Sequence, residues 1–62
     1  MNIKCFREKK NISQEVMAEQ LGVTQPAIAI WESGKAMPRA DKLPEIARVL
    51  GCEVSDLFRK EG

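Results

Sequence analysis

The 62-residue sequence contains no histidine and no tyrosine, and its aromatic residues are one tryptophan and two phenylalanines. Histidine is the side chain that most often serves as a general base near neutral pH, and it is a common zinc ligand. The two cysteines, Cys5 and Cys52, are far apart and form no CxxC motif, so they cannot supply the four ligands of a structural zinc site. We therefore expect no metal, no cofactor and no enzyme activity. We interpret both cysteines as buried free thiols, although a disulfide between them is formally possible.

Long apolar segments are also missing. No run approaches the ~20 residues that a membrane-spanning helix needs, and no segment resembles a secretion signal. A chain of this length forms one small domain with a modest core. Charged residues make up 31% and hydrophobic residues 44%, which is typical of a folded globular chain. We expect one cytoplasmic domain over residues 1–62, with no membrane partner, no small-molecule ligand and no ligand-sensing domain.

The net charge is only +1, but the charges are unevenly distributed. Residues 1–12 hold four cations and one anion, residues 13–34 hold three anions and no cation, and residues 35–48 hold four cations and two anions. Two basic segments thus flank an acidic one. This pattern is compatible with a basic rim around a binding face, and equally with chance in a short chain.

Every strong hydrophobic pattern in the sequence has helical periodicity, and these patterns predict an all-α fold of five helices. The first helix is expected over residues 3–9, with Asn11 as a stop. Capping residues give the limits of the next two helices, which are residues 14–21 between Ser13 as N-cap and Gly22, and residues 25–33 between Thr24 as N-cap and Gly34. Pro26 falls in the first turn of the third helix, where backbone N–H groups have no intrahelical partner. It therefore starts that helix and does not break it.

The last part of the sequence predicts two more helices. A stripe of apolar residues at helical spacing indicates the core-facing side of a fourth helix: Leu43, Ile46, Ala47 and Leu50. With Asp41 as N-cap, Pro44 would lie at the third helical position, and we expect an irregular or 3₁₀ start. A short fifth helix would follow Ser55 as its N-cap, and three apolar residues near it are expected in the core: Val54, Leu57 and Phe58.

The third helix has two different sides when its residues are placed 100° apart. Ile28 and Trp31 share one side, which we expect to face the core. The opposite side is small, apolar and nearly uncharged, and it consists of Pro26, Ala29, Ile30 and Ser33, with Gln25 at its N-terminal end. Such a surface suits the DNA major groove, where Ile30 can contact a thymine methyl group and Gln25 can hydrogen-bond to N6 and N7 of adenine. The alternative is an exposed glutamine beside an apolar residue that contacts nothing or another protein.

Residues 14–33 also have the pattern of a helix-turn-helix, with Gly22, Val23 and Thr24 between the two helices. The segment SQEVMAEQLGVTQPAIAIWESGK resembles the phage-repressor and Cro-type (lambda-repressor-like, XRE) helix-turn-helix family, through S-Q before the second helix, A and G at the turn, and W-E-x-G-K after the third helix. The resemblance extends from Ile3 to Phe58. It implies a compact five-helix domain and a transcriptional regulator, expected to be a repressor, that binds double-stranded operator DNA as a homodimer.

The resemblance implies roles for individual residues. The base-reading positions are Gln25, Pro26 and Ile30, and the phosphate-contacting positions are Gln14, Thr24, Ser33, Lys35 and Arg39. Gln14 would also brace Gln25, and Arg7 would pair with Glu32 across the first and third helices. The dimer surface would use the segment after Gly51, including Val54, Asp56 and Arg59. Base-reading positions in this family are often polar, whereas Pro26 and Ile30 are not, so direct readout would depend mainly on Gln25, with DNA shape supplying the rest.

A second hypothesis is a non-enzymatic protein-interaction module, in which the apolar side of the third helix binds a partner such as a toxin. The small net charge and Ile30 favour this hypothesis. The substitution Gln25→Ala distinguishes the two, because only DNA binding predicts a large loss of affinity for a specific duplex.

Overall fold

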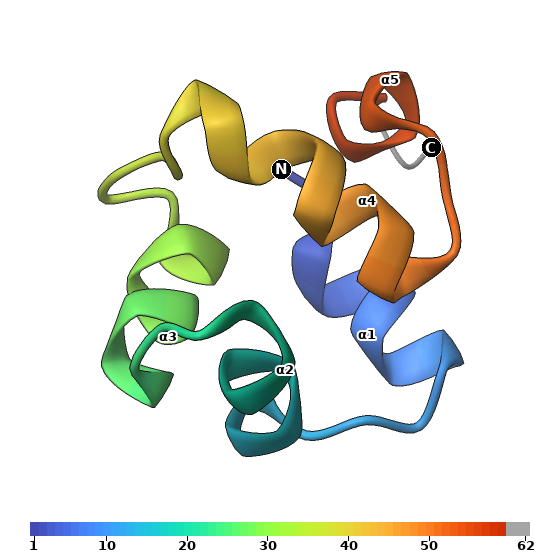
Figure 1. Cartoon of the computed structure of the whole chain (residues 1–62). Helices are drawn as coiled ribbons and strands as arrows, with labels where there is room; N and C mark the ends of the chain where they lie inside the picture. Colours follow the sequence, from blue (N-terminus) through green and yellow to red (C-terminus); the bar gives the residue numbers. More distant parts are fainter. Residues whose placement is uncertain (60–62) are drawn as a thin grey trace.

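The structure is a computed structural model that describes residues 1–59. These residues form five α-helices and one 3₁₀ turn, and no strand, so the predicted all-α fold is confirmed. The elements are α1 (Ile3–Lys9), α2 (Gln14–Leu21), α3 (Gln25–Ser33), η1 (Ala40–Lys42), α4 (Leu43–Leu50) and α5 (Val54–Leu57). Figure 1 shows α4 beside α1 in the middle of the molecule, with α3 and α5 on opposite sides.

Helices α2 and α3 begin and end at the expected capping residues. The Ser13 hydroxyl accepts a hydrogen bond from the Val16 amide at 3.0 Å, and the Thr24 hydroxyl accepts one from the Ala27 amide at 3.4 Å. Gly22 has φ +70°, a left-handed conformation that glycine adopts without strain. The chain therefore reverses sharply after α2 and leads directly into α3.

The core consists of nine buried apolar side chains, which come from all five helices. They are Ile3, Met17, Ala18, Leu21, Ile28, Ile46, Ala47, Leu50 and Leu57. Val23 and Trp31 are half-buried and pack against this cluster. No polar or charged residue among residues 1–59 is fully buried. The inward sides of the helices are thus held together mainly by apolar contacts, at roughly 25 cal/mol for each Å² of apolar surface removed from water.

The start of α4 differs from the prediction in one respect. An irregular start is confirmed, since η1 precedes the helix and Pro44 lies in its first turn. Asp41 is not the N-cap, however, because it lies inside η1, and the N-cap position is taken by Lys42 without a side-chain cap. Leu43 is half-buried and not in the core, because it stands at the junction of η1 and α4. Lys42 has another partner: its ammonium group donates to the Leu21 carbonyl at the end of α2, at 3.1 Å.

Helix α5 begins two residues earlier than expected. Ser55 is not its N-cap. Glu53 is, and it forms a capping box with Asp56 in which the Glu53 amide donates to the Asp56 carboxylate at 3.0 Å. The prediction that Phe58 returns to the core was also wrong, since this residue is 50% exposed. Leu57 fills the available core position, and the following residue lies about 100° further around the axis, toward solvent.

Both cysteines are free thiols, as expected, but they are half-buried and not fully buried. Burial raises the pKa of the Cys52 thiol, and the nearby carboxylates of Asp56 and Glu53 act in the same direction. At neutral pH this thiol is therefore held in its protonated, less reactive form. None of the helices within residues 1–59 combines the length and the apolar composition that crossing a membrane requires.

Candidate nucleic-acid interface

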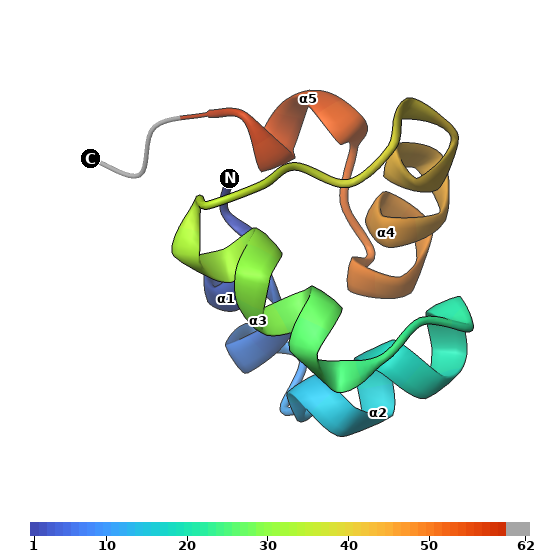
Figure 2. The same ribbon diagram turned by 90° about the vertical axis from the view of Figure 1, so that its left-hand side faces the viewer.

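Helix α3 lies at the surface of the molecule and is anchored from one side. In Figure 2 it crosses the front of the molecule, with α2 below it and α5 above. Its inward anchors are Ile28, which is completely buried, and Trp31, which packs against the core. Ile30 is 42% exposed, and Pro26 is exposed as well. The side of α3 that the sequence analysis assigned to binding is therefore accessible.

The accessible side of α3 carries no charge. Pro26, Ala29, Ile30 and Ser33 are all exposed, and none of them is ionisable. The one acidic residue of the helix, Glu32, is turned inward, so that its side chain is only 7% exposed. A rigid helix surface of small uncharged side chains can approach another surface closely, without the cost of desolvating a charge.

Glu32 is held by an arginine from α1. Arg7 Nε donates to Glu32 Oε2 at 2.7 Å and Arg7 Nη2 donates to Glu32 Oε1 at 3.3 Å, which makes the pair bidentate. Arg7 Nη1 also donates to the Ile12 carbonyl at 3.0 Å, in the segment that leads into α2. The pair that the resemblance implied thus lies between α1 and α3, and the guanidinium also reaches the segment before α2.

The electrostatics of this pair favour its charged form. The hydrogen bond to Glu32 raises the pKa of Arg7. Burial alone would raise the pKa of Glu32, but hydrogen bonds from Arg7 and Gln14, together with the positive charges of Arg7 and Lys4, hold it below the usual range. Glu32 is therefore ionised at neutral pH, and its two oxygens act only as hydrogen-bond acceptors.

Two glutamines continue from Glu32 to the protein surface. Gln14, the first residue of α2, donates from Nε2 to Glu32 Oε1 at 3.0 Å. Gln25, the first residue of α3, donates from Nε2 to Gln14 Oε1 at 3.4 Å. The structure therefore brings Gln14 and Gln25 together. The link from Gln14 to Glu32 was not predicted. A lone acid on an otherwise apolar helix indicates that it has inward partners, but no local pattern identifies Gln14 as one of them.

The other proposed phosphate contacts are distributed around the ends of α3. Thr24 caps the N-terminus. At the C-terminal end, the Ser33 hydroxyl donates to the Ile30 carbonyl at 2.7 Å and accepts from the Lys35 amide at 3.3 Å, so Ser33 orders the turn that carries the exposed Lys35. Arg39 is not joined to this group: it forms an exposed ion pair with Asp41 at 3.6 Å.

The segment implied as a dimer surface contains α5 and the residue pair that follows it. Val54 is half-buried against the core, and Asp56 pairs with Arg59 at 2.8 Å while it completes the capping box. Asn2 connects this segment to the N-terminus, since its backbone N–H donates to the Leu57 carbonyl at 2.8 Å. The segment is thus fixed to the rest of the domain, and Phe58 is its large exposed apolar side chain.

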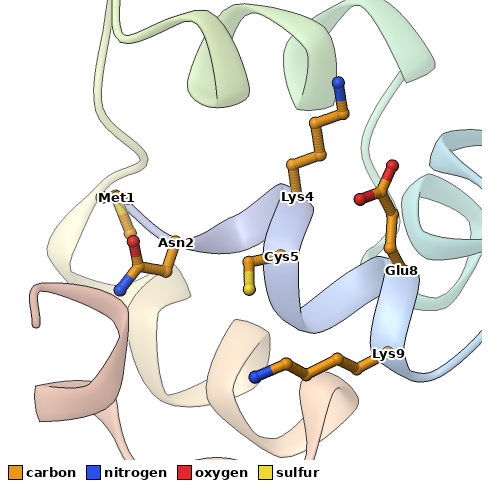
Figure 3. A pocket seen from close by; sticks show the side chains of 6 residues that line it. All are labelled: Met1, Asn2, Lys4, Cys5, Glu8 and Lys9. Carbon is orange, nitrogen blue, oxygen red and sulfur yellow. The ribbon is translucent and has the colours of Figure 1, made fainter. Parts of the chain in front are cut away.

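A separate open pocket lies beside α1 and includes no residue of α3. It is lined by Met1, Asn2, Lys4, Cys5, Glu8 and Lys9, whose side chains are drawn in Figure 3. The lining holds one thiol, that of Cys5, and it supplies no histidine that could activate this thiol. Among residues 1–59, no group of three or more His, Cys, Asp or Glu side chains is arranged to hold a metal ion.

Comparison with known proteins gives the same assignment for most of the chain. A family model described as helix-turn-helix matches residues 3–57. The chain is 40% identical over 59 residues to the HTH-type transcriptional activator BcrR of Enterococcus faecalis, and 39% identical over 56 residues to an uncharacterised HTH-type transcriptional regulator of Archaeoglobus fulgidus. It is also 33% identical over 60 residues to the uncharacterised HTH-type transcriptional regulator YqaE of Bacillus subtilis.

These alignments cover 95%, 90% and 97% of the present chain, respectively. They cover 29% of BcrR, 79% of the archaeal regulator and 52% of YqaE. The chain therefore spans less than a third of BcrR and about half of YqaE, and what it shares with them is the helix-turn-helix portion.

Proposed function

This chain belongs to the phage-repressor and Cro-type (XRE) helix-turn-helix family, and we propose that it is a DNA-binding transcriptional regulator that inserts the outward side of α3 into the major groove. The observation that carries the proposal is the exposed, uncharged surface of α3, which is anchored by the buried Ile28 and the half-buried Trp31 and has the amide of Gln25 at one end. An α-helix fits the width of the major groove, and a small outward side allows its axis to approach the base edges.

Base recognition would depend on two kinds of contact. Gln25 is exposed and carries both a donor and an acceptor, so it can form two hydrogen bonds with adenine at N7 and N6. Ile30 lies on the same exposed side and would contact a thymine methyl group. Pro26 offers no polar group, so it would contribute shape and close approach. One bidentate contact is worth ~1–3 kcal/mol of discrimination, which makes Gln25 the main specificity residue.

Phosphate contacts would set the position of α3 in the groove. The backbone N–H of Thr24, at the N-terminus of α3, suits an anion because the helix dipole is positive there. Gln14 retains one amide hydrogen beyond the one given to Glu32, and this hydrogen is available for a phosphate. At the other end of the helix, Ser33, Lys35 and Arg39 would hold the backbone, Arg39 by exchanging its exposed partner Asp41 for a phosphate.

Regulation would follow from occupancy of a promoter. A homodimer with two copies of α3 would read two half-sites about 10 base pairs apart, one turn of the duplex. Bound there, the protein would exclude polymerase and repress, without chemistry and without a cofactor. We propose the segment of Val54, Asp56 and Arg59 as the contact between the two copies, because it also carries the exposed ring of Phe58.

Selection of bound duplexes from a random DNA pool, at near-physiological salt, tests this function. We expect a defined sequence with two half-sites, and a fall in affinity with salt whose log–log slope is about −5, from ~0.9 for each of some six phosphates. Gln25→Ala should reduce the affinity for the selected duplex at least about fivefold. Gln20→Ala, which removes an exposed glutamine of α2, should leave this affinity unchanged. A flat salt response, or equal binding to all duplexes, would favour a protein-interaction module instead.

A further inference from the structure

Three side chains form a line from the interior to the end of α3. Glu32 lies at the inner end and is nearly buried, Gln14 is half-buried, and Gln25 is exposed. The distances are 3.0 Å from Gln14 Nε2 to Glu32 Oε1 and 3.4 Å from Gln25 Nε2 to Gln14 Oε1. Although Glu32 belongs to the same helix as Gln25, it reaches that residue only through Gln14 on α2.

The chemistry of the inner residue fixes the direction of both amides. An ionised carboxylate accepts hydrogen bonds and cannot donate them, so Gln14 must turn its NH₂ group toward Glu32. The carbonyl oxygen of Gln14 then points the other way, toward Gln25, and it too can only accept. Gln25 must therefore turn its NH₂ group toward Gln14. Arg7 prevents Glu32 from turning away, because it binds both carboxylate oxygens.

The direction of the Gln25 amide matters for reading a base. Adenine presents an acceptor at N7 beside a donor at N6, so an amide fits it in one direction and opposes it in the other. Without a fixed neighbour, a glutamine side chain can present its amide in either direction. The 3.4 Å contact is exposed to solvent in the free protein, and exclusion of water by DNA would strengthen it.

We infer that Glu32 is a positioning residue for base recognition: through Gln14, its carboxylate sets the direction in which Gln25 presents its amide to DNA. The inference deepens the proposed function and rests on it. It gives the nearly buried acid a role in specificity in addition to the ion pair with Arg7, and it makes the discrimination by Gln25 depend on a residue that does not touch DNA.

The experiment uses the full chain and a set of duplexes that differ only at the base pair read by Gln25. Gln14→Met removes the middle of the line and leaves the ion pair of Arg7 and Glu32 intact. Glu32→Gln replaces the carboxylate, which can only accept hydrogen bonds, by an amide that can turn either its oxygen or its NH₂ group toward Gln14. In both variants we expect the ratio of affinities between the preferred and the altered duplexes to fall about twofold or more, because the Gln25 amide is then free to take either direction.

An exchange of the two groups provides the rescue. In the double variant Gln14→Glu/Glu32→Gln, the amide at position 32 donates to the carboxylate at position 14, and this carboxylate again offers Gln25 only an acceptor. The ratio between duplexes should return toward the wild-type value, even though a carboxylate closer to the phosphates weakens binding to every duplex. Ile3→Val, a change in the core away from this line, controls for lost stability and should leave the ratio unchanged.

Side-chain amide NMR signals of Gln25 in the free protein provide a readout that needs no DNA. Glu32→Gln should shift these signals although residue 32 does not touch Gln25. If this variant fails to fold, Glu32→Asp, whose shorter side chain withdraws the carboxylate from Gln14, gives the same test. If the Gln25 signals did not change, or if Gln14→Met kept the ratio of affinities while the wild type preferred one duplex, the inference about Glu32 would be wrong and the proposed function would stand. A wild type that prefers no duplex would overturn the proposed function, and this inference with it.

Discussion

Helices α3 and α4 are similar in length and are anchored in the same way, but their outward sides differ. Each buries apolar side chains in the common core, Ile28 from α3 and Ile46 and Leu50 from α4. Outward, α4 presents the charged groups of Arg48 and Glu45 to water, whereas α3 presents uncharged groups, mostly small or apolar, with the amide of Gln25 at its N-terminal end. Inward residues thus determine where a helix lies, and outward residues determine what it can contact. The outer side of α4 suits water, and that of α3 suits a surface that displaces water.

The two helices also differ in their ion pairs. Glu32 of α3 pairs with Arg7 at 2.7 Å, and both side chains are nearly buried. Glu45 of α4 pairs with Lys42 at 3.7 Å, and both side chains are partly exposed. An exposed pair contributes little, ~0–1 kcal/mol, whereas a nearly buried bidentate pair restricts both partners to one geometry. The ion pair of α3 therefore restricts its two partners more strictly than the ion pair of α4 does.

The largest effect is expected from removing the inward anchor of α3. Ile28→Ala should lower the free energy of unfolding by ~2–5 kcal/mol, because the side chain is completely buried and its loss leaves a cavity. Ile30→Ala, two residues away on the exposed side, should cost less than about 1 kcal/mol. Urea unfolding followed by circular dichroism compares the two variants. Equal losses would mean that α3 is not anchored from one side only.

The next effect concerns the ion pairs and is dependent on pH. The pKa of Glu32 is lowered in the folded state, so the unfolded chain binds more protons in acid. Its stabilisation is complete above the ordinary glutamate value of 4.5 and is lost as the pH falls through the lower folded-state pKa. Glu32→Gln should cost about 2 kcal/mol at pH 7, the scale of hydrogen bonds to a charged group, and little at pH 2.

Glu45→Gln is the matched control for this prediction, since it neutralises an acid in the exposed pair on α4. It should change the free energy of unfolding by less than about 1 kcal/mol at neutral pH. Urea titrations at pH 7 and pH 2 measure both variants. If Glu45→Gln proved as costly as Glu32→Gln, the contrast between the two pairs would be wrong.

A smaller effect is expected from a charge on the outward side of α3. Ile30→Glu places a carboxylate between the phosphate backbones, and we expect at least about tenfold weaker binding to the selected duplex, or ~1.4 kcal/mol. Arg48→Ala changes the net charge of the protein by the same amount but acts on α4. Fluorescence anisotropy at one salt concentration compares them. A similar loss of affinity in both variants would mean that Ile30→Glu acts through the net charge of the protein and not through its position on α3.

The smallest effect is expected when the N-caps of α2 and α3 are removed one at a time. Ser13→Ala and Thr24→Ala each remove a hydroxyl that accepts a hydrogen bond from the first turn of its helix, and each should cost ~1 kcal/mol of stability. Only Thr24→Ala alters the N-terminus of α3, so only this variant should also weaken DNA binding, by a few-fold. Thermal unfolding measures the stability of each variant, and the same anisotropy titration measures its DNA affinity. If only Ser13→Ala weakened DNA binding, the N-terminus of α2 and not that of α3 would be the one that contacts DNA.

The fold was largely predictable because local signals agree with one another. Ser13 and Thr24 mark helix starts, Gly34 marks an end, and the spacing of Ile46 and Leu50 marks a buried side. The errors occur where local rules compete. Ser55 looks like a cap, but Glu53 and Asp56 satisfy each other two residues earlier and extend the helix.

The candidate site was predictable only in part, because its connections lie between distant segments. Periodicity identified the two sides of α3, and the family resemblance supplied the pair of Arg7 and Glu32. The hydrogen bond from Gln14 to Glu32 joins residues 18 positions apart, and the one from Lys42 to the Leu21 carbonyl joins residues 21 apart. No local pattern encodes such contacts, since they depend on how the helices pack.

The central claim is that the outward side of α3, and not that of α4, contacts DNA. Addition of the selected duplex to the ¹⁵N-labelled protein tests this most directly, by the chemical shifts of backbone amides. The account predicts the largest shifts along Gln25–Ser33 and at the start of α2, with α4 nearly unchanged. Shifts centred on α4 or on the pocket beside α1, with α3 unaffected, would contradict it.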